Sequence, residues 1–134
     1  MIAIRVCSGK KRYGEKGFLY EIYEPCVMLK AFFRRCRTLK IKYGVLSRKF
    51  GIILENPNYP GYPDEDCLTD KELLKKLRKQ GKEIKEELVY WNHRPLTHRK
   101  WVSMLREAGL RIREVRTLKE LEYQFMEGLD EYLV

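Results

Sequence analysis

The stretch LVYW, from Leu88 to Trp91, decides the fold class. All four residues are apolar, and polar residues bound the stretch on both sides. A strand that is covered on both faces has this continuous pattern, whereas a strand with one face in water alternates apolar and polar residues. LVYW therefore predicts a buried strand in a sheet that has helices on both faces.

Three further segments have the pattern of strands. Apolar residues occupy alternate positions in residues 2–6, 39–45 and 110–115, which is the period of a strand. Helical patterns fill the intervals, so that strands and helices alternate around a longer middle segment. This order predicts an α/β fold in a single domain over residues 1–134, with a mainly parallel sheet of about four strands and flanking helices in a Rossmann-like three-layer arrangement.

Each predicted helix has a boundary signal. A proline suits a first helical turn, a Thr with Glu three residues later forms a capping box, and a glycine ends a helix. The signals are Pro25 before an apolar stripe, Thr69 with Glu72, Thr97 as a cap with Gly109 as a stop, and Thr117 with Glu120.

The net charge of +9 is divided unevenly along the chain. Residues 1–54 hold 13 Lys and Arg against 3 Glu, a balance of +10, while residues 55–134 hold 15 against 16 acidic residues, a balance of −1. A basic region of this kind favours a polyanion, which is a nucleic acid, nucleotide phosphates or, less often, an acidic membrane surface. The alternative is a solvated surface rich in Lys and Arg.

Composition bounds the remaining classes. No apolar run of about 18 residues occurs, and the apolar opening is too short for a signal peptide, so we expect a cytoplasmic protein without a membrane partner. The four cysteines form no C-x-x-C pair, and no His stands at finger-like spacing, so we expect buried thiols and neither a metal nor a cofactor. Few Gln, Asn and Ser beside abundant Lys, Arg and Glu suggest a thermophile protein.

The loops that follow the predicted strands hold the candidate binding site. The carboxyl ends of parallel strands meet at one edge, where loops and helix amino termini converge and anions bind. We expect a basic rim there, formed by Lys10, Lys11, Arg48, Lys49, His93, Arg94 and Arg116. Ser8, Gly9 and Asn92 add polar groups for a phosphate or a sugar. The sequence "SGKK" lacks the order of a P-loop, which disfavours nucleoside triphosphate hydrolysis.

His93, Asp64 and Ser47 are the main candidates for catalysis, and Cys7 is a fourth. His93 at a strand end suits an acid or base, or a purely structural position. Asp64 lies in the acidic stretch "YPDEDC", which forms either a charged site or a solvated turn. Ser47 can contact a sugar or a base. Cys7 beside the lysines suits a nucleophile or a buried residue, and Tyr59 or Tyr62 could stack on a base.

Four segments carry a resemblance to a known family. "CSGKK", "FLYEIY", "YGVLSRKFGII" and "PDED" are similar to those of uncharacterised bacterial, archaeal and phage proteins, which are related at fold level to YaaA-like proteins and to nucleobase-excising or deazaguanine-linked domains. The resemblance covers residues 1–66 well and the remainder weakly. The matching positions are Cys7, Ser8, Lys11, Tyr20, Leu46, Ser47, Lys49 and Gly51. The chain departs from the family where Trp91, Asn92 and His93 replace small residues, and where "TLKELEY" replaces a glycine turn.

Two functions follow from these patterns. The first is the binding of a nucleic acid or a phosphate-bearing ligand at the basic rim. The second is an enzyme that excises or exchanges a base at an N-glycosidic bond, in which Asp64 stabilises the charge that develops on the sugar. The exposed edge strand of a small open sheet also favours a homodimer.

Overall fold

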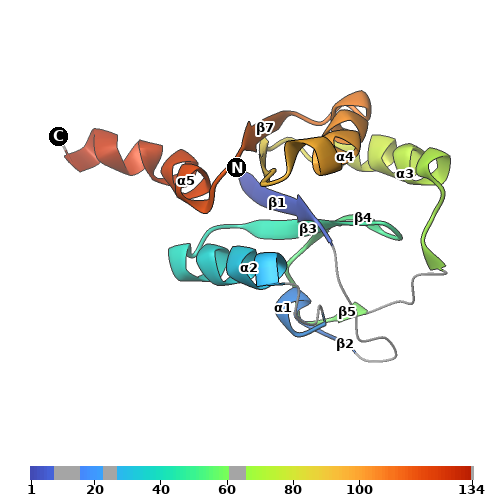
Figure 1. The fold of residues 1–134 in the computed structure, drawn as a ribbon, viewed down its shortest axis with the longest axis horizontal. Coiled ribbons are helices and arrows are strands. Elements are labelled where there is room, and N and C mark those ends of the chain that lie inside the picture. Colours follow the sequence, from blue (N-terminus) through green and yellow to red (C-terminus); the bar gives the residue numbers. More distant parts are fainter. Residues whose placement is uncertain (8–15, 23–26, 61–65, 134) are drawn as a thin grey trace.

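The computed structural model describes residues 1–7, 16–22, 27–60 and 66–133, except the side chains of residues 21–22 and 127–133. Within these residues a five-stranded sheet has the order β4-β3-β1-β6-β7 (Figure 1). The strands are β1 (Ile2–Val6), β3 (Tyr43–Ser47), β4 (Gly51–Leu54), β6 (Leu88–Trp91) and β7 (Ile112–Val115). β1 is parallel to β3 and β6, and β6 is parallel to β7, whereas β4 is antiparallel to β3. The mainly parallel α/β sheet is thus confirmed.

Helices cover both faces of the sheet, which gives three layers. α2 (Val27–Leu39) and α5 (Leu118–Leu133) pack against one face, and α3 (Asp70–Glu83) and α4 (Pro95–Glu107) against the other (Figure 1). A short helix α1 (Leu19–Ile22) lies beside a two-stranded sheet of β2 (Lys16–Gly17) and β5 (Tyr59–Pro60). None of the described helices is long and apolar enough to cross a membrane.

The alternation along β1 divides the core in two. Ile2, Ile4 and Val6 join the cluster under α3 and α4, whereas Ala3 and Cys7 join the cluster under α2 and α5. Every residue of β1 is buried. LVYW is likewise buried at all four positions and forms β6 over the predicted residues.

Two strand predictions need correction. The strand predicted for residues 39–45 begins only at Tyr43, because α2 continues to Leu39 and ends through Lys40, whose φ of +56° is left-handed. A left-handed residue at this place closes the last turn of a helix. The antiparallel strand β4 was not predicted at all. It follows a turn in which the Ser47 Oγ accepts hydrogen bonds from the Lys49 and Phe50 N–H groups, at 3.2 and 3.1 Å.

The sequence signals for the helix boundaries are tested only within the described residues, and Pro25 lies outside them. The predicted capping box of Thr69 and Glu72 is present at the start of α3. Gly109 follows α4 with a φ of +90°, as a helix stop requires. Thr97 does not cap α4, since that helix begins two residues earlier at Pro95. Proline suits the first helical position because it has no N–H group to satisfy.

Candidate functional site

The chain changes direction across the sheet between β1 and β6. From β1 the chain leads through α2 to β3 on one side, and from β6 it leads through α4 to β7 on the other. α2 and α4 therefore lie on opposite faces, as crossovers of one hand require. Ligands of open α/β sheets bind in the crevice at this switch point, beyond the carboxyl ends of the strands. The fold therefore favours a ligand at the carboxyl ends of β1 and β6.

A buried cation lies near the carboxyl end of β1. Arg5 is only 3% exposed, and its guanidinium carbon lies 5.3 Å from the ring centroid of Trp91 on the neighbouring strand. The face of an indole attracts a cation, and more strongly when water is excluded. Arg5 thus places a positive charge inside the carboxyl edge of the sheet, where an anion would be stabilised.

A hydrogen-bonded chain joins β1, β6 and α4 at the same level. The Val6 N–H group donates to the Tyr90 hydroxyl oxygen at 3.1 Å, and that oxygen lies 2.9 Å from the Nδ1 of His98. Because a backbone N–H group can only donate, the hydroxyl proton of Tyr90 is free to be donated to Nδ1 of a neutral His98. Burial, together with the charge of Arg5, lowers the pKa of His98 to about 4. The imidazole of His98 is therefore neutral near pH 7.

His93 lies next to these hydrogen-bonded residues, at the carboxyl end of β6. Its ring centroid is 5.1 Å from that of Trp91 and 5.3 Å from that of His98. Its Nδ1 atom is buried and has no hydrogen-bond partner among the described residues. Burial and then the charges of Arg5 and Arg94 lower the pKa of His93. A neutral imidazole can accept a proton, so the position of His93 suits an acid or base as well as a structural role.

Helix α4 begins at this edge without help from a side chain. Its N-cap residue, Arg94, makes no capping hydrogen bond, and its first turn holds no acidic residue. The first N–H groups of a helix lack partners within the helix and carry a partial positive charge. This helix start therefore favours an anion.

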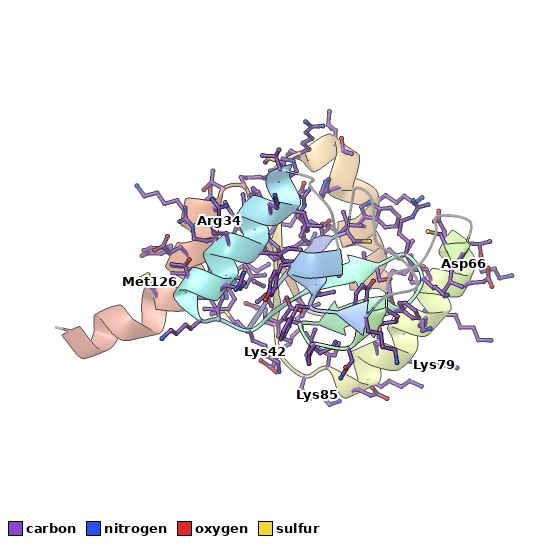
Figure 2. The ribbon with its side chains drawn as sticks, turned by 90° about the horizontal axis from the view of Figure 1, so that it is seen from below. Arg34, Lys42, Asp66, Lys79, Lys85 and Met126 are labelled. Carbon is purple, nitrogen blue, oxygen red and sulfur yellow. The ribbon has the colours of Figure 1, made fainter. Side chains whose placement is uncertain are left out.

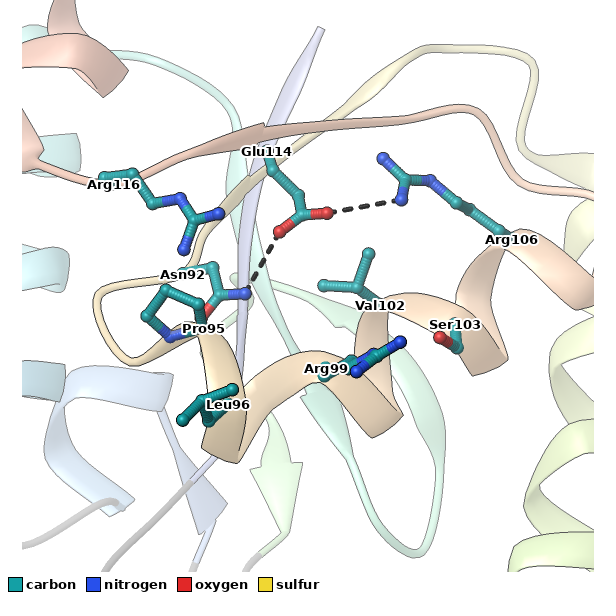
Figure 3. Close-up of a pocket in the computed structure, with 9 residues that line it drawn as sticks. All are labelled: Asn92, Pro95, Leu96, Arg99, Val102, Ser103, Arg106, Glu114 and Arg116. Carbon is teal, nitrogen blue, oxygen red and sulfur yellow. Dashed lines mark hydrogen bonds and ion pairs between the residues drawn. The ribbon is translucent and has the colours of Figure 1, made fainter.

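A cavity of about 280 Å³ opens between α4 and β7 (Figure 3). Arg99, Ser103 and Arg106 come from α4, whereas Glu114 and Arg116 come from β7 and the residue that follows it. Asn92 at the end of β6 forms part of the inner wall, and its Nδ2 donates to Glu114 Oε2 at 3.1 Å. The cavity is polar and basic, and it lies beside the switch point.

The predicted rim is only partly within the described residues. Ser8, Gly9, Lys10, Lys11, Asp64 and Tyr62 lie outside them. Arg48 is exposed, with its guanidinium carbon 5.9 Å from the Trp101 ring centroid, and Lys49 Nζ lies 3.5 Å from a carboxylate oxygen of Asp66. Because β3, β6 and β7 are parallel, Arg48, Arg94 and Arg116 all follow strands at the carboxyl edge.

Several candidate side chains are buried. Ser47 has no exposed surface, and its two backbone hydrogen bonds give it a part in fixing the β3–β4 turn. Cys7 and Tyr59 are buried within the core under α2. Asn92 is 1% exposed but lines the cavity. No group of three His, Cys, Asp or Glu side chains that could hold a metal occurs among the described residues.

Much of the amino-terminal positive charge lies away from this edge. Arg34 and Lys30 are on the exposed side of α2 (Figure 2), and Arg35 pairs with Glu122 at 2.5 Å. Lys42 pairs with Glu86 at 2.6 Å, near the amino ends of β3 and β6. The balance of +10 in residues 1–54 is therefore spread over several surfaces and does not by itself locate a site.

Sequence reasoning missed Arg5, Tyr90, His98, Arg99, Arg106 and Glu114 as site residues. Arg5 had a signal, since it is the one charged residue inside the apolar stretch IAIRV. The others had none, because their proximity depends on how α4 lies across β6 and β7.

Comparison of the chain with models of protein families, with curated proteins and with solved structures finds no match in any of the three. The resemblance to YaaA-like proteins therefore stays a prediction.

Proposed function

We propose that the protein binds a phosphate-bearing ligand, a nucleic acid or a nucleotide, at the carboxyl edge of its sheet. One observation carries this proposal. At the switch point, α4 begins without a side-chain cap and directly after Arg94. Backbone N–H groups together with nearby guanidinium groups are the donors that phosphate oxygens require.

The neighbouring helix supports this choice of place. α3 lies beside α4, but the Thr69 hydroxyl accepts from the Glu72 N–H group, and Asp70 and Glu72 put negative charge in the first turn of α3. An anion is repelled there. α4 has neither feature, so an anion at this edge is bound best at α4.

The test is a salt titration of binding to short single- and double-stranded DNA and RNA, followed by fluorescence anisotropy. We expect a steep loss of affinity with salt, because phosphate contacts release counterions. The double variant Arg48→Ala, Arg94→Ala removes two cations of the rim. If both contact phosphates, it reduces the slope of log affinity against log salt by about 2.

Two matched double variants locate the surface. Lys79→Ala with Lys82→Ala removes two exposed cations from the last turns of α3, beside the end of α4 and away from its start, and we expect no change in the slope. Lys30→Ala with Arg34→Ala removes two cations from α2. A reduced slope in this variant, with an unchanged slope in the rim variant, would move the site to α2. No binding of any oligonucleotide or nucleotide at low salt would overturn the proposal.

The alternative is an enzyme that excises or exchanges a base, and the neutral imidazole of His93 at the switch point supports it. In this alternative Asp64 stabilises charge on the sugar and Ser47 contributes to the site. Analysis of the same binding reactions for released base tests it. His93→Gln would then abolish base release and leave affinity nearly unchanged, whereas a pure binder releases no base.

A further inference from the structure

We propose that the cavity between α4 and β7 binds the terminal phosphate of the ligand, which is a phosphate monoester dianion. This inference rests on the proposed function, because it names the part of the ligand that the site recognises. It concerns Arg99, Ser103 and Arg106, which no sequence pattern singled out.

The net charge of the cavity matches a ligand with two negative charges. Arg106 is neutralised, since its guanidinium donates to Glu114 Oε1 at 3.2 Å and to the Ile112 carbonyl at 3.3 Å. Arg99 and Arg116 also line the cavity, and neither forms an ion pair with a carboxylate in the part of the chain that the structure describes. Three guanidinium groups against one carboxylate leave a charge of +2. A phosphate monoester carries about −1.5 to −2 near pH 7, whereas an internal phosphodiester carries −1.

Asn92 helps to hold the Glu114 carboxylate beside Arg106. Its Nδ2 donates to the second oxygen of Glu114, so the carboxylate is held from β6 as well as from Arg106. The carboxylate thereby stays with Arg106 and leaves the other two guanidinium groups to a ligand. Figure 3 shows Asn92 and Arg106 on opposite sides of Glu114.

The inner wall of the cavity is chemically incomplete. Asn92 is 1% exposed, and its Oδ1 is buried without a hydrogen-bond partner among the described residues. A buried unsatisfied acceptor is uncommon in folded proteins and is explained by an enclosed water, an ion or strain. Asn92 lines the cavity, but its Oδ1 is enclosed by protein atoms and offers a ligand no accessible surface.

The cavity is large enough for a phosphate group. Its volume of about 280 Å³ is close to the lower end of the ~300–1,000 Å³ of sites that hold drug-sized molecules. Arg99 and Ser103 are four residues apart on α4 and so lie on one side of the helix, where both can donate to the same phosphate.

The experiment compares one short oligonucleotide in three forms, with a 5′-phosphate, with a 3′-phosphate and with hydroxyl groups at both ends. Binding is measured by fluorescence anisotropy at constant salt and pH 7.5, and the readout is the ratio of affinities. We expect one phosphorylated form to bind about 10-fold more tightly than the hydroxyl form. The ratio falls as the pH is lowered through about 6, where a phosphate monoester loses its second charge.

Variants of Arg99 test the cavity directly. Arg99 is exposed, so its substitution leaves the core intact. Arg99→Gln reduces the ratio towards 1, and Arg99→Lys keeps the charge and part of the ratio. Lys79→Gln, which removes an equal charge from the last turns of α3, leaves the ratio unchanged.

The outcomes separate the two proposals. Salt-sensitive binding of all three forms with equal affinity keeps the proposed function and overturns the terminal-phosphate site. A preference that Arg99→Gln does not reduce also overturns this site. Absence of binding by any form and by free nucleotides, at low salt, overturns the proposed function and this inference together.

Discussion

Helices α3 and α4 lie side by side on one face of the sheet, and both begin at its carboxyl edge. α3 begins with a reciprocal capping box and acidic residues in its first turn. α4 begins after Arg94, without a side-chain cap and without an acidic residue. The buried residues of α3 are the two leucines Leu73 and Leu77, whereas α4 buries the imidazole of His98 beside its apolar residues.

This difference distinguishes a helix start that is closed by its own side chains from one that is open to a ligand, as the proposed function requires. Thr69 and Glu72 at the start of α3 satisfy each other's backbone N–H groups. The start of α4 has no such side-chain partner and directly follows Arg94.

The bodies of the two helices should contribute equally to stability. Leu77 and Leu105 are both without exposed surface, so Leu77→Ala and Leu105→Ala are each expected to lower the free energy of unfolding by about 2–5 kcal/mol. Urea denaturation measures both changes. If Leu105→Ala lowers the free energy of unfolding by less than half as much as Leu77→Ala, the two helices do not pack equally well. The difference between α3 and α4 would then include the body of α4 as well as its start.

The pH dependence of stability should be tied to α4. The pKa of His98 is lowered from 6.5 to about 4 in the fold, so the unfolded chain binds more protons between these values and stability falls as the pH falls through this window. The full loss attributable to His98 is about 3 kcal/mol, at 1.36 kcal/mol for each pKa unit.

His98→Asn isolates this contribution, because an amide oxygen can still accept the Tyr90 hydroxyl proton and does not titrate. Urea denaturation between pH 4 and pH 7 should show a shallower loss of stability in the variant than in the parent, although His93 still titrates in both. Equal slopes would show that His98 is not the group responsible.

The helix starts should respond in opposite directions to exchanged caps. Thr69→Ala removes the capping box of α3 and is expected to cost about 1 kcal/mol, while Arg94→Asp supplies α4 with a cap and is expected to add about 1 kcal/mol. Thermal unfolding measures both. Arg94→Asp should also weaken binding of phosphate-bearing ligands, whereas Thr69→Ala should not. If Arg94→Asp stabilises the protein and the variant binds phosphate-bearing ligands as tightly as the parent, the start of α4 does not contribute to the binding site.

Prediction from sequence was best where the pattern is local. The capping box at Thr69 and the glycine stop at Gly109 depend on neighbouring residues only, and both are present. The strand at LVYW was placed over the correct residues, because a continuous apolar run has few alternatives in a sheet covered on both faces. The start of α4 was misplaced because Pro95 and Thr97 are both acceptable helix starts, and the proline was the one used.

The candidate site was predictable only in outline. Parallel strands bring their carboxyl ends to one edge, so His93, Asn92, Arg94 and Arg116 were expected near one another from the order of the elements. β4 was missed because GIIL is as apolar as a buried helix segment, and its pairing with β3 depends on a turn held by the buried Ser47 hydroxyl.

The sequence by itself determined the alternation of strands and helices and the buried central strands, since these follow from hydrophobic period and chain order. Only the tertiary structure decided which charges are available to a ligand. Glu114 neutralises Arg106 and leaves Arg99 and Arg116, and Arg5 lies buried against Trp91. The physical reason is that an ion pair or a buried cation depends on contacts between side chains from different elements. The spacing of residues within one segment does not predict such contacts.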